Sequence, residues 1–440
     1  MIKYIKNKIS QLDEHTLEVL YKSISSTVVK VIGMIIGVLV SISLGHLIGA
    51  EGLGIIGLSN RITSLILVVA LLGMPQVIIK EMAIAKSKNN LERIGNIIYT
   101  TSIINGVLSI LLSTIFILLS PWIANVVFQE SNLTYPLIVF IIIIPIQVFS
   151  RIFGSGLIAY KKIWQSNLVD QTLSVAITGL LLLFTWFLKI EITVNLIAIF
   201  YAIGRIFTML TVGGYWSKMY RFNGVRSFIP KELLKTALPL LFVSMTLLLA
   251  SSIDAIMLGW LSNVTQVGYY TVALQLALLT SFFLQVSNSI MMPKIAALYS
   301  AKSLAEMKGM IQKVTSLLIV IGVIAVLGFV LIGRPLLSLW GTEFTNAYSI
   351  LIILSIGQFF NIASGPVGSI LMMCNYEKVL RNITFVSLLL NVILNYLLIS
   401  NFGANGAAMA TAITIAVIMI ISSYFIKKKL GYLPFKFFSK

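Results

Sequence analysis

Six ionisable side chains lie inside long apolar runs of the sequence, where a charge is costly. They are Lys30, Arg61, Arg151, Asp170, Arg205 and Asp254. On insertion scales a charge at the centre of a membrane-spanning helix costs about 2.5–3.5 kcal/mol, so such residues pair or face water and mark functional sites. All four cations lie in the first half of the chain, and the second half contributes only Asp254. This asymmetry predicts an anionic ligand among the cations and a cation or gating role for the carboxylates.

The depth of these residues separates two groups, because each helical residue adds about 1.5 Å along the helix axis. An inner group lies about six to nine residues from the cytoplasmic ends of its runs and comprises Lys30, Arg151, Asp170 and Arg205. Arg61 and Asp254 form an outer group, about seven residues from the outer ends. We expect this outer pair to close a cleft between two halves of the protein. Structural roles within one half, and direct contact with substrate or ion, are the alternatives.

The inner group holds three cations and one acid. Its surplus positive charge suits an anion, which Arg and Lys bind through charge-assisted hydrogen bonds. Structural alternatives exist for two members. Asp170 can neutralise Arg205 on the next run as a purely structural ion pair, and Arg151 lies near a lysine-rich loop, where its side chain can extend to the inner headgroups. For Lys30 we favour a side chain that faces a cavity between the helices.

Uncharged polar residues in later runs extend the candidate site. A polar cavity lining, or simple hydrogen bonding between helices, is expected at Gln275, Gln285, Asn288, Gln358 and Asn361. Asn391 and Asn395 are spaced i, i+4 and so share a helix face. The intramembrane carboxylates that could carry H⁺ or bind Na⁺ as a coupling ion are Asp170 and Asp254.

The sequence lacks the residue patterns of common enzymes. It contains no G-x-x-x-x-G-K-[ST] phosphate loop, and its two histidines, His15 and His46, lie near the ends of runs. Cys374 is the only cysteine, which excludes an intrachain disulfide and a zinc cluster of thiolates. We predict no catalytic residues, no metal site and no cofactor, so the protein is not expected to be an enzyme.

The composition predicts an all-α integral membrane protein. Of 440 residues, 58% are hydrophobic and 10% charged, with a mean hydropathy of +1.00, whereas soluble domains carry about 25% charged residues. A helix crosses the hydrocarbon core with about 20 apolar residues. Twelve such runs occur, near 24–46, 54–79, 96–120, 134–158, 164–188, 193–214, 237–261, 266–291, 312–333, 347–373, 382–400 and 405–426.

Basic residues between the runs set the orientation. The net charge is +18, and 26 of the 32 Lys and Arg residues fall in loops on one side, against two on the other. By the positive-inside rule, both termini are cytoplasmic, and the charge indicates topology rather than nucleic-acid binding. The predicted domains are a cytoplasmic amphipathic segment (1–22), an N-lobe (23–215), a cytoplasmic connector (216–235), a C-lobe (236–426) and a basic tail (427–440).

An internal repeat relates the two lobes. A shift of 214 residues places 16–97 on 230–311 without a gap, so that Gly54 meets Gly268 and Lys80 meets Lys294. Each repeat holds six runs, an even number, which predicts two six-helix lobes related by a pseudo-twofold along the membrane normal. Two lobes with a cleft between them are typical of alternating-access transporters.

Local sequence signals predict helix breaks and helix starts. We expect bends at Pro75, Pro145 and Pro366, with the Gly365–Pro366 step as the strongest candidate for a broken helix. Pro230 suits a first helical position. Ser303 and Glu306 form a capping-box pattern, which predicts a helix from Ser303 to Ile311.

Three stretches carry a family resemblance: LGHLIGAEGLGIIGL at 44–58, GLIAYKKIWQSNLV at 156–169 and NFGANGAAMATAI at 401–413. Together with the twelve runs, they resemble the bacterial polysaccharide-unit flippases of the O-antigen (Wzx-type) group. That group belongs to the multidrug/oligosaccharidyl-lipid/polysaccharide flippase superfamily.

The resemblance implies a substrate and a location. The substrate would be an undecaprenyl-pyrophosphate-linked oligosaccharide, an O-antigen, capsule or exopolysaccharide repeat unit, moved from the inner to the outer leaflet of the bacterial cytoplasmic membrane. The implied partners are membrane lipids and the polymerase and glycosyltransferases of polysaccharide assembly. The pyrophosphate would bind among Lys30, Arg61, Arg151 and Arg205.

Other functions remain open. A multidrug/cation antiporter of the same superfamily would prefer an acidic or aromatic cavity. A lipid II flippase usually has two extra spans. A major-facilitator carrier would show a D-R/K-x-G-R cluster, which is missing from KEMAIAKSKNNLER at 80–93. A membrane scaffold for glycan synthesis is the alternative without transport.

Overall fold

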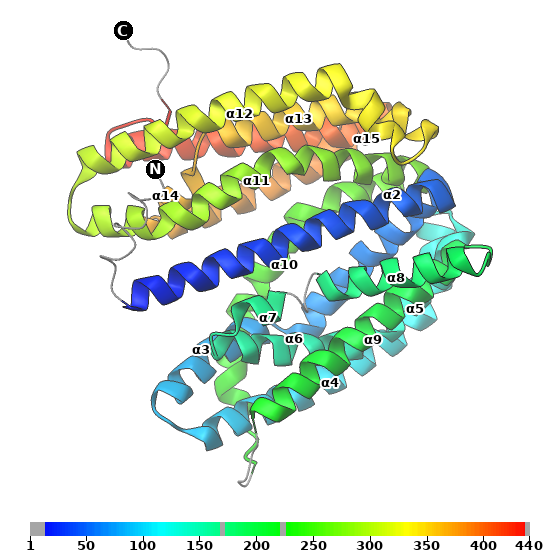
Figure 1. Ribbon diagram of the computed structural model, residues 1–440, viewed down its shortest axis with the longest axis horizontal. Coiled ribbons are helices and arrows are strands. Elements are labelled where there is room, and N and C mark those ends of the chain that lie inside the picture. The colour runs from blue at the N-terminus through cyan, green and yellow to red at the C-terminus, as the bar shows by residue number, and fades with distance from the viewer. Residues whose placement is uncertain (1–13, 168–171, 221–225, 436–440) are drawn as a thin grey trace. The chain divides into compact units, whose positions relative to one another are not determined.

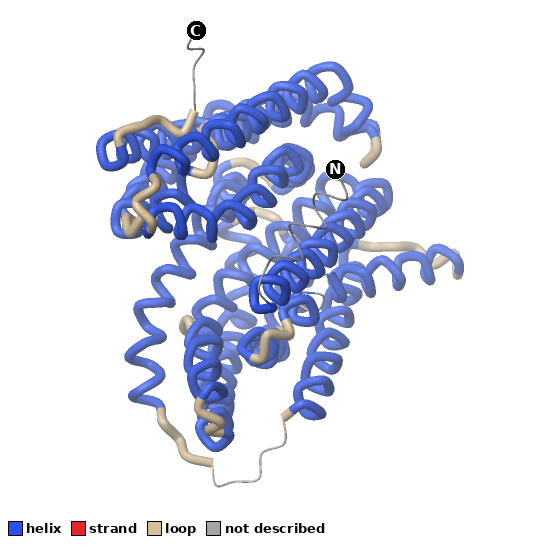
Figure 2. The backbone as a smooth tube through the Cα atoms, turned by 60° about the vertical axis from the view of Figure 1, so that its left-hand side comes forward, coloured by secondary structure: helices blue, strands red, loops and turns tan. Residues whose placement is uncertain are grey.

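The computed structural model describes residues 14–167, 172–220 and 226–435, and all secondary structure in these ranges is helical (Figure 2). The first half contains α2 (Glu14–Leu71), α3 (Met74–Ser87), α4 (Leu91–Trp122), the short turns η1 (Ile123–Val127) and η2 (Ser131–Leu133), α5 (Thr134–Ile142), α6 (Ile144–Ala159), α7 (Ile163–Asn167), α8 (Ser174–Phe187) and α9 (Val194–Met219). The second half contains α10 (Pro230–Leu261), α11 (Val264–Ser300), α12 (Leu304–Ser338), η4 (Thr342–Ala347), α13 (Tyr348–Ala363), α14 (Val367–Met373) and α15 (Glu377–Leu430).

The two longest helices, α2 and α15, are each a pair of spans that meet at a glycine. Gly49 in α2 has φ 64° and ψ −170°, and Gly403 in α15 has φ 53° and ψ −132°. Glycine adopts such positive φ values at little cost, so the chain can reverse there. The predicted runs 24–46 and 382–400 lie before these turns, and the runs 54–79 and 405–426 lie after them.

Each of these two turns is held by a distant side chain. The Glu343 carboxylate accepts a hydrogen bond from the Ala50 N–H at 2.8 Å, and Gln266 Oε1 accepts from the Ala404 N–H at 3.3 Å. A first-turn N–H of a helix lacks an intrahelical acceptor, so these side chains act as caps for the second span of each pair.

The bends or breaks predicted at the three prolines are confirmed. α3 begins after Gly73, with Pro75 in its first turn, and α6 begins beside Pro145 with a bend of 42° from α5. The break between α13 and α14 falls at the predicted Gly365–Pro366 step, where Gly365 has φ 71°.

The predicted helix starts have a mixed outcome. α10 begins at Pro230 as predicted. The predicted helix after Ser303 is also present, but the Ser303 side chain makes no capping hydrogen bond. The capping-box hydrogen bond was therefore predicted wrongly, although the pattern marks the start of the helix. Most of the predicted amphipathic segment at 1–22 lies outside the described residues.

The predicted fold class is confirmed. In the described part of the chain, eight helices are long and apolar enough to cross a membrane, and the bent pair of α5 and α6 forms a ninth span. Division of α2 and α15 at their glycines, with the shorter apolar helix α8, accounts for twelve. The protein is thus an all-α, multi-pass membrane protein with about twelve spans, in keeping with two lobes.

Contacts divide the chain into two compact units. The N-unit holds the described residues of Met1–Val40, Thr63–Ser120 and Tyr135–Met245, and the C-unit those of Ser41–Ile62, Pro121–Thr134 and Thr246–Lys440. The segment 41–62, which belongs to the predicted N-lobe, thus packs within the C-unit. The predicted domain boundaries and the pseudo-twofold stay predictions.

Within each unit the helices pack as neighbouring rods. In the C-unit, α13 packs against α11, α12 and α15 (Figure 1). In the N-unit, α9 packs against α6 and α8, and α6 packs against α3. Helices α11, α13 and α15 contribute side chains to the candidate site, and α10 contributes its carboxylate.

Candidate functional site

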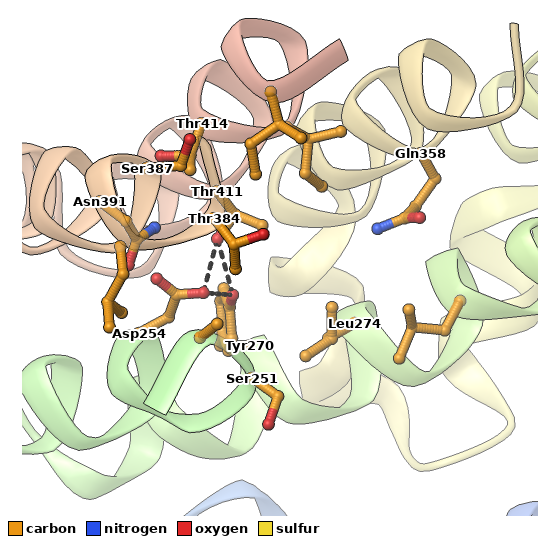
Figure 3. Close-up of a pocket in the computed structure, with 15 residues that line it drawn as sticks. Ser251, Asp254, Tyr270, Leu274, Gln358, Thr384, Ser387, Asn391, Thr411 and Thr414 are labelled. Atoms are coloured by element: carbon orange, nitrogen blue, oxygen red, sulfur yellow. Dashed lines mark hydrogen bonds between the residues drawn. The ribbon is translucent and has the colours of Figure 1, made fainter. Parts of the chain in front are cut away.

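Asp254 of α10 lies at the centre of a buried hydrogen-bond network in the C-unit (Figure 3). The residue is 6% exposed. Its Oδ2 accepts hydrogen bonds from Tyr270 OH of α11 at 3.0 Å and from Thr411 Oγ1 of α15 at 2.8 Å. Its Oδ1 accepts from Asn395 Nδ2 of α15 at 2.6 Å. Two helices, α11 and α15, therefore position donors around a carboxylate on a third, α10, which offsets part of the cost of burying it.

The two hydroxyl groups of this network have more acceptors than hydrogens. Besides Asp254, Tyr270 OH lies 3.0 Å from Thr411 Oγ1, and Thr411 Oγ1 lies 3.0 Å from the Ala407 carbonyl oxygen. Each hydroxyl carries one hydrogen, so the two of them can donate to only two of their acceptors at a time. The network is consequently rich in oxygen lone pairs.

Asn395 adds a further buried oxygen. Its Nδ2 also donates to Asn391 Oδ1 at 2.9 Å, the i, i+4 neighbour on α15, while its own Oδ1 has no hydrogen-bond partner and the residue is fully buried. Rotation of the amide by half a turn would present Oδ1 to the carboxylate, which is favourable only with a cation between them.

A cavity of about 220 Å³ adjoins the network. Its polar lining includes Asp254, Tyr270, Gln358, Asn391 and Thr411 (Figure 3), and its apolar lining consists of Ala250, Leu274, Leu278, Leu388, Ile415 and Ile418. Pockets for drug-sized ligands usually measure about 300–1,000 Å³. This cavity is smaller than that range.

Arg61 of α2 belongs to the C-unit and lies next to the turn of α10 that precedes Asp254. Its Nη1 donates to the Ser251 carbonyl oxygen at 3.3 Å, and its charge interacts with Asp254 and Tyr270. Ser251 also lines the cavity. The structure thus brings the outer group of the sequence analysis together, through a backbone carbonyl rather than through the carboxylate itself.

Arg205 of α9 lies in the N-unit and bonds to a neutral partner. Its Nη1 donates to Gln147 Oε1 of α6, and its guanidinium lies 5.5 Å from the centre of the Phe140 ring. Arg205 also interacts electrostatically with Arg151. Asp170, its predicted partner, lies outside the described residues. Gln147 has a buried Nε2 without a hydrogen-bond partner.

The remaining predicted residues are dispersed. Lys30 on α2 and Arg151 on α6 are exposed. On α11, Gln275 and Asn288 are half-buried and Gln285 is exposed.

Gln358 on α13 fits both of its predicted roles. Its Oε1 accepts hydrogen bonds from Ser281 of α11 and from Asn361 Nδ2, the latter at 3.2 Å. It therefore links α11 and α13, in agreement with the predicted hydrogen bonding between helices, and it also lines the cavity.

Sequence reasoning missed Tyr270 and Thr411. Neither residue is unusual within an apolar run, and their relation to Asp254 depends on the contact of three separate helices. The available signal was the i, i+4 spacing of Asn391 and Asn395, which places both on the face that reaches Asp254.

Comparison with known proteins agrees with this fold. The family model described as "Polysaccharide biosynthesis protein" matches residues 19–299, more than half of the chain, and the MatE model matches residues 239–397. A capsular polysaccharide biosynthesis protein of Staphylococcus aureus is 27% identical over 255 residues, 56% of this chain and 64% of that protein. A probable low-salt glycan biosynthesis flippase of Haloferax volcanii is 27% identical over 177 residues, 40% of this chain and 38% of that protein. These matches thus span less than two thirds of either relative's length.

Two solved structures share the fold. A multidrug resistance MATE family transporter of the MOP superfamily, in an inward-facing conformation, matches with a TM-score of 0.75 and 16% identity, over 91% of this chain and 94% of that one. The lipid II flippase MurJ, in an inward closed conformation, matches with a TM-score of 0.74 and 15% identity, over 93% and 87%.

The Haloferax volcanii relative is named as a probable flippase, and the two solved proteins as a transporter and a flippase, which agrees with the prediction that the protein is not an enzyme. The match over residues 19–299 establishes that the chain belongs to the polysaccharide biosynthesis protein family.

Proposed function

We propose that the protein is a flippase that moves an undecaprenyl-pyrophosphate-linked oligosaccharide from the inner to the outer leaflet of the bacterial cytoplasmic membrane by alternating access. The observation that carries the proposal is the match to the polysaccharide biosynthesis family, whose relatives include a named glycan flippase. The cargo is an O-antigen, capsule or exopolysaccharide repeat unit. Both termini are cytoplasmic, as the basic loops indicate.

Cationic side chains of the N-unit are proposed to receive the pyrophosphate. Arg151 and Arg205 interact as like charges, and an anion that lies close to both would relieve their repulsion. A guanidinium also matches phosphate oxygens geometrically. Lys30 is exposed on α2 and would add a third positive charge.

Asp254 is proposed as the site of the coupling ion. The carboxylate, the Thr411 and Tyr270 hydroxyls and the two asparagine oxygens form a set of hard oxygen donors. Transporters coordinate Na⁺ with such oxygens near the middle of broken helices. The donor chemistry fits Na⁺, and H⁺ is the alternative ion. Asp170, the second predicted carboxylate, lies outside the described residues.

Arg61 is proposed to close the outer side of the pathway. Its hydrogen bond to the Ser251 carbonyl joins the second span of the chain to α10, and this bond would break when the pathway opens outward. The ion gradient, or consumption of the lipid carrier, would drive transport. We propose no ATP hydrolysis by this chain.

A multidrug/cation antiporter is the second candidate function. The MatE match to residues 239–397 includes Asp254 and favours this alternative. The two functions differ in cargo, since an antiporter moves cations and a flippase moves an anionic lipid. The inner cations therefore favour the flippase.

The deciding experiment is deletion in the native host, followed by analysis of lipid-linked glycans. We expect an undecaprenyl-pyrophosphate-linked oligosaccharide to accumulate on the cytoplasmic side, and the wild-type gene to reverse this. A deletion strain with no such accumulation, but with increased sensitivity to cationic drugs, would instead identify an antiporter.

Purified protein allows a direct test. In liposomes that contain a lipid-linked glycan, the wild type should speed its movement between leaflets, and an imposed Na⁺ or H⁺ gradient should change the rate. Asp254→Asn should remove the gradient response, whereas the exposed Asn401→Asp on α15 should not. Liposomes with no protein-dependent movement under any gradient would argue for a scaffold.

A further inference from the structure

Arg61 is a cationic side chain next to the Asp254 network. It donates to the Ser251 carbonyl oxygen at 3.3 Å, one helical turn before Asp254 on α10, and its charge interacts with Asp254 and Tyr270. Ser251 and Asp254 line the same cavity. The guanidinium is therefore close enough to act on any charge that enters this cavity.

The local charges do not balance without Arg61. Among the residues in the described part of the chain that line the cavity, Asp254 is the only carboxylate, and none is Lys or Arg. The three hydrogen-bond donors to the carboxylate, Tyr270, Thr411 and Asn395, are neutral. Hydrogen bonds solvate the carboxylate but leave its charge in place, and Arg61 or a mobile cation would compensate this charge.

We propose that Arg61 is a tethered counter-charge that competes with a mobile cation for Asp254. This inference rests on the proposed role of Asp254 as the coupling-ion site. While Arg61 holds the Ser251 carbonyl, its positive charge repels a cation from the cavity. Withdrawal of Arg61 leaves the carboxylate uncompensated and raises its affinity for Na⁺.

This competition would link ion binding to conformation. Arg61 enters the C-unit on the segment 41–62, so its contact with α10 exists only while that segment is packed there. Thermodynamic coupling between Na⁺ binding and this contact is reciprocal. Na⁺ at Asp254 therefore weakens the Arg61–Ser251 contact to the same extent that the contact weakens Na⁺ binding.

The test is Na⁺-dependent thermal stabilisation of the purified full-length protein, with choline chloride to hold ionic strength constant. Arg61→Gln removes the charge and keeps a hydrogen-bond donor, and we expect the Na⁺ concentration at half-maximal stabilisation to fall about tenfold, within the range usual for coupled sites. Arg61→Lys keeps the charge and should stay near the wild type. Arg61→Met is a second neutral variant should the glutamine variant not fold.

The outcomes separate this inference from the proposal on which it rests. The role of Arg61 alone would be overturned by two results together. Na⁺ stabilisation would be lost in Asp254→Asn, and its midpoint concentration would be the same in the wild type, Arg61→Gln and Arg61→Met. No Na⁺ stabilisation of the wild type would overturn both the Na⁺ site and the competition. A lowered midpoint in both neutral variants, with Arg61→Lys unchanged, supports the competition.

Discussion

Gly54 of α2 packs directly against Gly268 of α11, two residues that are 214 positions apart. A Cβ atom on Gly54 would lie 1.8 Å from the Val264 carbonyl oxygen and 3.1 Å from the Gly268 nitrogen, and a Cβ on Gly268 would lie 1.9 Å from the Ala50 carbonyl oxygen. The same interval of 214 residues superposes the two repeats. The repeat-matched glycines therefore meet, and they let two helices of the C-unit approach at backbone distance.

Either glycine should be intolerant of a single methyl group. Because the added Cβ would overlap backbone atoms, Gly54→Ala and Gly268→Ala should each lower the free energy of unfolding by at least about 2 kcal/mol. Thermal melting of the detergent-purified protein measures this loss. Gly328→Ala on α12 is the matched control, since nothing lies within 4 Å of its added Cβ, and should be neutral or slightly stabilising. Equal melting temperatures for all three variants would contradict the close packing.

Asn395→Asp should make the protein dependent on Na⁺ for stability. It places a second carboxylate where Asn395 Nδ2 now lies 2.6 Å from Asp254 Oδ1, and two like charges at that distance repel unless a cation lies between them. In choline chloride the variant should melt below the wild type, and NaCl should raise its melting temperature more than it raises that of the wild type. Asn401→Asp, exposed on the same helix, is the control. A variant with the wild-type response to NaCl would contradict a cation site here.

Glu343→Ala should weaken the turn at Gly49. The variant removes the acceptor of the Ala50 N–H, and loss of a helix cap costs about 0.5–2 kcal/mol. The expected result is a lower melting temperature. Glu306→Ala removes an exposed glutamate from the first turn of α12 and should have a smaller effect. If the two variants have the same melting temperature, the Glu343 hydrogen bond contributes no more to stability than the exposed charge of Glu306.

Cys374 should resist thiol reagents in the folded protein. The residue is fully buried directly after α14, and burial raises the pKa of its thiol to about 11. The thiolate is the reactive form, so N-ethylmaleimide should label the native protein far more slowly at pH 8 than the heat-unfolded protein. Cys374 is the only cysteine, so the assay needs no other substitution. Rapid labelling of the native protein would contradict this burial.

The same thiol predicts a direction of pH dependence. The folded-state pKa lies above the ordinary value of 9.0, so the unfolded chain loses this proton first as the pH rises. The contribution of the buried neutral thiol is fully present below pH 9 and is lost between about pH 9 and 11. Melting temperatures of the wild type and Cys374→Ala should therefore converge over this interval, and a constant difference would contradict the shift.

The sequence by itself determined the class of fold and the main breaks in the helices. Transfer of side chains into hydrocarbon is a local property of each run, so the spans could be counted without knowledge of their contacts. Pro75, Pro145 and Pro366 marked breaks because proline removes a hydrogen-bond donor from its own helix. The capping pattern at Ser303 marked a helix start, but its side-chain hydrogen bond did not form.

Only the tertiary structure decided which side chains meet. Arg61 precedes Ser251 by 190 residues, and the segment that carries it packs in the C-unit rather than in the N-unit. The partners of Asp254 come from α11 and from both halves of α15. Apolar runs of similar composition can pack in many registers, so hydropathy does not specify these contacts. They are selected by the close approach of backbones at residues such as Gly54 and by the need of each buried polar group for a partner.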